Sequence, residues 1–102
     1  MKYQLVIQFQ ATSPDDFDDL MVLEDALRKE IGNSSLVDGH DFGSGELNIF
    51  VLTNNPDVAF QEVQEVAQRI HPKQRMRVAY RDLAKGGYNI LWPPNLTHFN
   101  VA

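Results

Sequence analysis

The residues best suited to chemistry lie between Asp38 and Glu46, where three carboxylates and one histidine fall within nine positions. Such oxygen ligands with one imidazole could bind a divalent cation, or His40 could act as a general base oriented by Asp41. The alternative is a glycine-rich connection whose polar side chains cap turns. We favour the connection, because turn residues of this kind are common and loops are usually surface features. The glycines do not fit a phosphate-binding loop, since a strand rather than a helix follows them.

A second cluster of acidic residues lies at the start of the first predicted helix. These carboxylates could simply complement the positive end of the helix dipole, or they could contact a basic protein partner. We take the following as candidates for a partner-binding surface: Asp15, Asp16, Asp18, Asp19, Asp38, Asp41 and Glu46. The sequence predicts no metal site, no cofactor and no catalytic residue.

A basic strip follows in the second half, where Arg75, Arg77 and Arg81 alternate along one face of a predicted strand. This face resembles an RNA-recognition surface in outline. It lacks the paired stacking aromatics and the overall basic charge that RNA binding needs, so we expect no nucleic-acid partner. Trp92 could line a pocket at the sheet edge together with Tyr88, or both rings could close one end of the core.

The remaining candidates belong to a small-ligand site on the sheet face that the helices leave uncovered. A pocket on that face would draw on both the glycine-rich segment and the later strands. The candidates for ligand binding are His40, Asp41, Arg77, Tyr80 and Trp92.

Composition limits the class of protein. The chain has 102 residues, 43% of them hydrophobic and 23% charged, with no cysteine, which is typical of one folded domain over residues 1–102. The net charge is −5, and residues 1–51 hold ten acids against three bases. This acidity argues against anionic membranes and nucleic acids. No apolar stretch is long enough for a membrane span or reads as a secretory signal, so we expect a cytoplasmic protein.

Hydrophobic periodicity predicts seven elements in the order βαββαββ. Apolar residues alternate in strands and recur at helical spacing in helices, and a proline in the first turn marks the start of each helix. The predicted strands and helices cover residues 2–10, 14–31, 35–38, 47–53, 56–70, 75–81 and 88–92. We expect Gly32 to end the first helix in a left-handed conformation. The weak strand 35–38 should be followed by a loop that contains the glycines.

This order predicts an α+β fold, a ferredoxin-like βαββαβ two-layer sandwich with an extra C-terminal strand. Two right-handed crossovers would place the first and third strands at the centre of the sheet. The tail, residues 92–102, alternates apolar and polar positions. It could add as a strand to the edge of a neighbouring chain or fold back on its own sheet.

The segment from Asp38 to Thr53, with Asn55-Pro56 after it, resembles small uncharacterised bacterial α+β proteins of this length. That resemblance implies no particular activity. In size and charge the chain is also similar to immunity proteins that neutralise toxins, a likeness that implies a protein partner.

Two functions follow as expectations. The first is a non-enzymatic module that binds a protein partner through its acidic surface. The second is a dimeric small-ligand binder or enzyme in which paired sheet faces enclose a pocket, an analogy from the expected fold alone.

Overall fold

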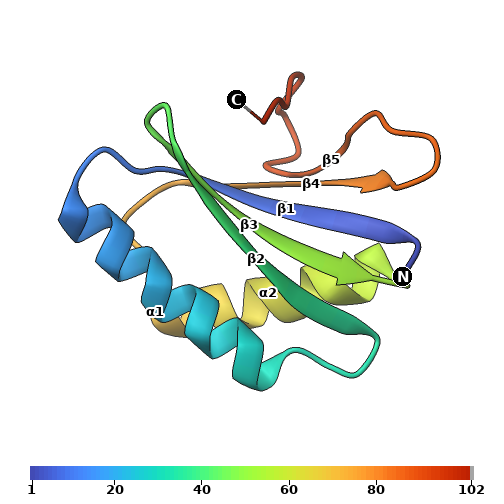
Figure 1. Cartoon of the computed structure of the whole chain (residues 1–102), viewed down its shortest axis with the longest axis horizontal. Coiled ribbons are helices and arrows are strands. Elements are labelled where there is room, and N and C mark those ends of the chain that lie inside the picture. Colours follow the sequence, from blue (N-terminus) through green and yellow to red (C-terminus); the bar gives the residue numbers. More distant parts are fainter. Residues whose placement is uncertain (102) are drawn as a thin grey trace.

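The computed structural model describes residues 1–101 and contains two helices and one five-stranded antiparallel sheet (Figure 1). The predicted order of elements is confirmed. The bounds are β1 Tyr3–Gln10, α1 Pro14–Glu30, β2 Ser35–Gly43, β3 Glu46–Thr53, α2 Pro56–Ile70, β4 Met76–Asp82 and β5 Asn89–Trp92. The strands lie in the order β2-β3-β1-β4-β5. Each of the first and third strands therefore has a neighbour on both sides.

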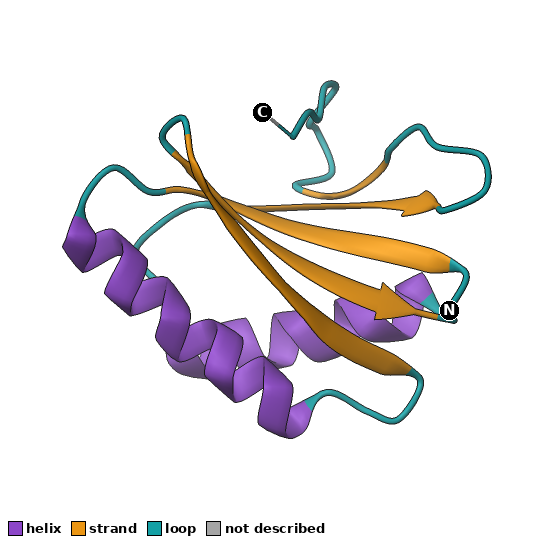
Figure 2. Cartoon of the chain, viewed as in Figure 1, coloured by secondary structure: helices purple, strands orange, loops and turns teal. Residues whose placement is uncertain are grey.

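Both helices cover one face of the sheet (Figure 2). Alternate strand residues point toward the helices and form the main core, as Leu5, Ile7 and Phe9 do from β1. The helices supply matching apolar side chains, among them Leu23 and Val63, both of which are fully buried. Burial of each such side chain contributes about 1.5–3 kcal/mol to folding.

Each helix begins where a polar side chain caps its free amides. Ser13 Oγ accepts a hydrogen bond from the Asp16 amide at 3.1 Å, and Asn55 Oδ1 accepts one from the Val58 amide at 3.3 Å. A proline follows each capping residue, as the sequence predicted. Within residues 1–101, no helix combines the length and apolarity needed to cross a membrane.

The loop predicted after residue 38, around the glycines 39, 43 and 45, is wrong. β2 continues through this segment to Gly43 and pairs with β3 along its whole length, with a bulge between Val37 and Gly39. The turn is only Ser44-Gly45, and both residues have positive φ, 55° and 76°. A two-residue hairpin needs that conformation, because it matches the twist of the flanking strands. The glycine-rich segment is thus an edge strand with a tight hairpin.

The first helix ends differently from the prediction. Ile31 is the C-terminal capping residue and its backbone is extended, at φ −66° and ψ 142°, so Gly32 provides no left-handed cap. Instead, the Gly32 amide donates a hydrogen bond to Glu62 Oε2 at 2.9 Å. A Cβ at position 32 would lie 2.7 Å from that oxygen. Glycine is present here because a carboxylate from α2 approaches the backbone closely.

The sheet face opposite the helices is covered in part by the chain after β5 (Figure 1). Phe99 packs there on Val6 and Ala79 in a second, smaller apolar cluster. Val6 and Ala79 are fully buried and Phe99 is 8% exposed. The C-terminal segment therefore folds back on its own sheet, over the face that the sequence analysis expected to be open.

Candidate functional site

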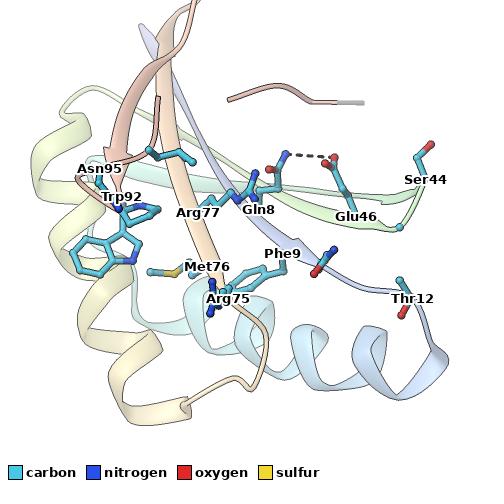
Figure 3. A pocket seen from close by; sticks show the side chains of 14 residues that line it. Gln8, Phe9, Thr12, Ser44, Glu46, Arg75, Met76, Arg77, Trp92 and Asn95 are labelled. Carbon is cyan, nitrogen blue, oxygen red and sulfur yellow. Dashed lines mark hydrogen bonds between the residues drawn. The ribbon is translucent and has the colours of Figure 1, made fainter. Parts of the chain in front are cut away.

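A groove of about 1000 Å³ lies at one end of the sheet, beside the C-terminal segment (Figure 3). The end of β1 and the start of β4 form its floor, and the turn before β3 forms one side. Pro93, Asn95 and Leu96 of the C-terminal segment contribute to its lining as well. The groove brings together chain segments that are far apart in the sequence.

Two arginines line this groove. Arg77 lies opposite Gln8 in the register of β4 with β1, and Arg75 precedes it by two positions. Alternate residues of a strand share one face, so the Arg77 side chain projects from the face opposite the helices, as Gln8 does. Arg75 comes just before β4 and lines the groove as well. In Figure 3, Arg75, Met76 and Arg77 lie between Trp92 at one end and Ser44 and Thr12 at the other.

Neither arginine has a hydrogen-bond or ion-pair partner among the described residues. Some other cations do pair: Lys2 lies 3.9 Å from Asp82, Lys73 lies 3.7 Å from Asp19, and Arg69 pairs with Glu30. The exposed Lys29 and Lys85, like the exposed Arg75 and Arg77, have no ion pair among the described residues. Arg77 and Arg75 therefore carry two adjacent charges that residues 1–101 leave unneutralised, in a protein whose net charge is −5. Five fixed donors per guanidinium are available to an external acceptor.

A buried amide cluster forms the inner end of the groove. Gln8 Nε2 donates to Asn48 Oδ1 at 3.0 Å and to the Asn100 carbonyl at 2.7 Å, and Glu46 Oε1 lies 3.4 Å away. Gln8 is 3% exposed and Asn48 is 2% exposed. Since buried polar groups are costly when unpaired, these bonds fix the C-terminal segment against β1. Gln8 was not singled out as a site residue, because its contacts are to distant parts of the chain.

Trp92 contributes an aromatic surface at the opposite end of the groove from the hairpin turn (Figure 3). Its side chain is 38% exposed, so part of the ring is available to a ligand. The predicted partner Tyr88 lies elsewhere: its ring packs on Phe99, with centroids 5.1 Å apart. The structure thus separates the two rings that the sequence analysis had grouped.

His40 and Asp41 lie on opposite faces of β2. His40 pairs in register with the core residue Ile49, whereas Asp41 pairs with Asn48 on the other face. Asp41 therefore does not orient His40. Instead, His40 Nδ1 lies 3.1 Å from both carboxylate oxygens of Glu24 on α1.

Glu24 is the partner of His40, and sequence reasoning did not identify it. Its side chain is 6% exposed, and Arg28 Nη2 lies 3.9 Å from Oε2. His40 also packs edge-on against Phe17, with ring centroids 5.6 Å apart. These contacts hold the edge strand β2 on α1. Simple alternation counted from the core residue Val37 would have put His40 on the other face, and the bulge between Val37 and Gly39 turns it toward the helix instead.

Tyr80 faces the helices rather than the groove. Its ring meets Tyr3 edge-on at 5.9 Å, and it packs against the main core. Of the five candidates for ligand binding, only Arg77 and Trp92 line the groove.

The acidic candidates do not form one continuous surface. Asp15 and Asp18 are exposed on α1, and Asp38 and Asp41 are exposed on β2. Glu46 lines the groove. Asp41 and Glu46 therefore lie on the sheet face opposite the α1 carboxylates.

The Asp16 carboxylate makes hydrogen bonds within the fold. Its Oδ2 accepts a hydrogen bond from the Thr12 amide at 3.1 Å, and its Oδ1 accepts one from Gln74 Nε2 at 2.8 Å. The Thr12 amide, with Gln74 and Ser13, holds the pKa of the Asp16 carboxyl below its usual value. The carboxylate joins the start of α1 to the segment that precedes β4.

Residues 1–101 contain no cluster of three or more His, Asp or Glu side chains arranged to hold a metal ion. The groove lining holds no histidine, so the groups it offers are guanidinium, amide, hydroxyl, carboxylate and indole. These groups bind and orient ligands. Comparison of the chain with protein-family models and with curated proteins found no match to either.

Proposed function

We propose that this protein is a non-catalytic binding module whose ligand occupies the groove between β4 and the C-terminal segment. The observation that carries the proposal is the unneutralised pair Arg75 and Arg77 beside the exposed ring of Trp92. Concave sites that combine an aromatic surface with a few converging polar groups are the usual form of a ligand site.

We further infer that the fold is ferredoxin-like with β5 added at one edge. The strand order supports this inference, because β1 and β2 flank β3 while β3 and β4 flank β1. Two such interleaved βαβ units make up the split arrangement. In this fold the face opposite the helices is available for binding, and here the C-terminal segment narrows it to the groove.

The groove proposal can be tested with a mixed library of small fragments and amide NMR spectra of the labelled protein. We expect fragments with Kd values of roughly 1 mM or lower to shift the amides of Gln8 and Arg77 and the indole N–H of Trp92. Gln10→Trp, which puts a bulky ring at the groove, should abolish these shifts. Gln61→Trp, at an exposed position of α2, is the matched control and should retain them. Shifts centred on another surface would contradict the proposal.

A second candidate is a protein partner with a basic surface, bound by the exposed carboxylates of α1. Asp15 and Asp18 support it, because they are exposed on the same helix and have no ion-pair partner within residues 1–101. Opposite charges at an interface steer association and add specificity. The likeness to immunity proteins in size and charge points to the same class of partner.

This candidate is tested by capture from a cell lysate at two salt concentrations, followed by purification of any basic protein retained. The double change Asp15→Asn, Asp18→Asn should weaken binding of that purified protein about tenfold at low salt, with a smaller loss at high salt. The control is Glu65→Gln, an exposed carboxylate on α2. Equal binding by the double variant and the parent would remove α1 as the interface.

A further inference from the structure

We propose that the ligand of the groove is a small aromatic oxyanion, meaning a carboxylate or phosphate group attached to a planar ring. This inference rests on the proposed function and specifies its ligand class. It depends on the distribution of charge, aromatic surface and free space along the groove.

The oxyanion end is defined by the two arginines. Residues two apart in an extended chain have Cα atoms about 7 Å apart, and Arg75 and Arg77 both line the groove. Guanidinium groups at that spacing can converge on one carboxylate or phosphate, which they bind through paired N–H donors. The described part of the chain gives neither Arg75 nor Arg77 an acceptor of its own. An external anion would provide those acceptors.

The aromatic end is defined by Trp92. The ring is 38% exposed, and Met76, Pro93 and Leu96 line the groove with it. A flat indole surface favours a planar ring by offset stacking or edge contact. Since the arginines and Trp92 lie along one groove (Figure 3), a single ligand could contact both.

Glu46 is the one carboxylate in the groove, and it lies away from the arginines. It is on β3, while the arginines are on or beside β4, with β1 between them. Two interstrand spacings place the backbones of Glu46 and Arg77 roughly 10 Å apart, and no ion pair joins Glu46 to either arginine among the described residues. Glu46 also faces the Gln8 amide. An anion held by the arginines is therefore compatible with this carboxylate.

The size of the ligand is limited by the C-terminal segment. Phe99 and its neighbours cover Val6 and Ala79 near the middle of the sheet face. A chain of stacked bases or a long peptide would need that area, whereas a small molecule needs only the groove. The uncovered volume, about 1000 Å³, is at the upper end of the range for small-molecule sites.

The experiment compares matched probes by calorimetry, and by the fluorescence of Trp92, the only tryptophan in the chain. Phenyl phosphate and phenylacetate carry the oxyanion on a ring, benzyl alcohol is the neutral counterpart, benzylamine the cationic one, and inorganic phosphate lacks the ring. We expect both aromatic oxyanions to bind at least about tenfold more tightly than the other three probes, since charge-assisted bonds supply the difference. The tighter of the two identifies the head group.

Two variants locate the oxyanion. Arg77→Gln and Arg75→Gln should each weaken binding of the better aromatic oxyanion about tenfold, while Lys85→Gln, which removes an exposed cation outside the groove, should leave it unchanged. All three positions lie at the protein surface, and urea unfolding of each variant checks that the fold is retained.

If benzyl alcohol binds as tightly as the oxyanions, or if Arg77→Gln binds the oxyanion with unaltered affinity, the proposed ligand class is wrong. The groove would still be a binding site. An equal loss of oxyanion binding in Lys85→Gln would overturn it too. Tighter binding of a six-nucleotide single strand than of phenyl phosphate would overturn the small-molecule assignment. If no probe or fragment perturbs the groove, the proposed function fails as well.

Discussion

Single residues in this protein have roles that depend on contacts invisible in the linear sequence. Asp16 stands among three other acidic residues and was grouped with them as a candidate for partner binding. The structure shows instead that its carboxylate accepts bonds from the Thr12 amide and from Gln74, fifty-eight positions away. Asp18, two positions further on, is exposed. Two acidic residues of one run thus contribute to different properties, one to the fold and one to the surface.

The Asp16 contacts predict a specific dependence of stability on pH. The pKa of this carboxyl is lower in the folded protein than its ordinary value of 3.8. Its stabilising contribution is therefore complete above pH 3.8 and is lost as pH falls through the lower, folded-state pKa. Asp16→Asn should be less stable than the parent at pH 7, and the difference should shrink once the pH falls below 3.8.

Urea unfolding at pH 7, 5, 3.5 and 2.5 provides the measurement. Asp25→Asn, at an exposed position in the middle of α1, is the control and should change the free energy of unfolding less at pH 7. A constant difference between the parent and Asp16→Asn down to pH 2.5 would show that the carboxylate charge plays no part.

At the scale of elements, the sequence predicted those features of the helices and strands that depend on neighbouring residues. Both helix starts were found because Ser13 and Asn55 each precede a proline, and capping acts within one turn. The wrong prediction of a loop between residues 38 and 47 has a physical cause as well. Glycines and polar residues usually mark loops, but here they occupy an edge strand, where a bulge and charged side chains are common protection against pairing with other chains.

The candidate site was predicted only in part, for the same reason. Arg77 and Trp92, which the sequence grouped as residues of one pocket, line the same groove, whereas His40, Asp41 and Tyr80 lie outside it. Gln8 and Glu24 were missed, since their partners come from distant elements. Alternation predicts which face a residue occupies, while long-range contacts decide what it meets there.

At the scale of the whole molecule, different segments of the chain cover the two faces of the sheet. The helices bury the main core on one face, and the C-terminal segment buries a smaller cluster on the other (Figure 2). This second cover also forms one side of the groove. The shape of the proposed binding site therefore depends on the docking of the last residues, which the sequence left open between two alternatives.

Because the groove depends on the docking of the C-terminal segment, replacing Phe99 tests whether that segment packs on the sheet. Its ring is 8% exposed and packs on Val6, Ala79 and Tyr88. Phe99→Ala should lower the free energy of unfolding by about 3 kcal/mol, the low end for a buried phenylalanine, measured by urea unfolding. Leu83→Ala, an exposed apolar position, should change it by less than about 0.5 kcal/mol. A loss no greater in Phe99→Ala than in Leu83→Ala would mean that the C-terminal segment contributes nothing to the fold and leaves this sheet face open.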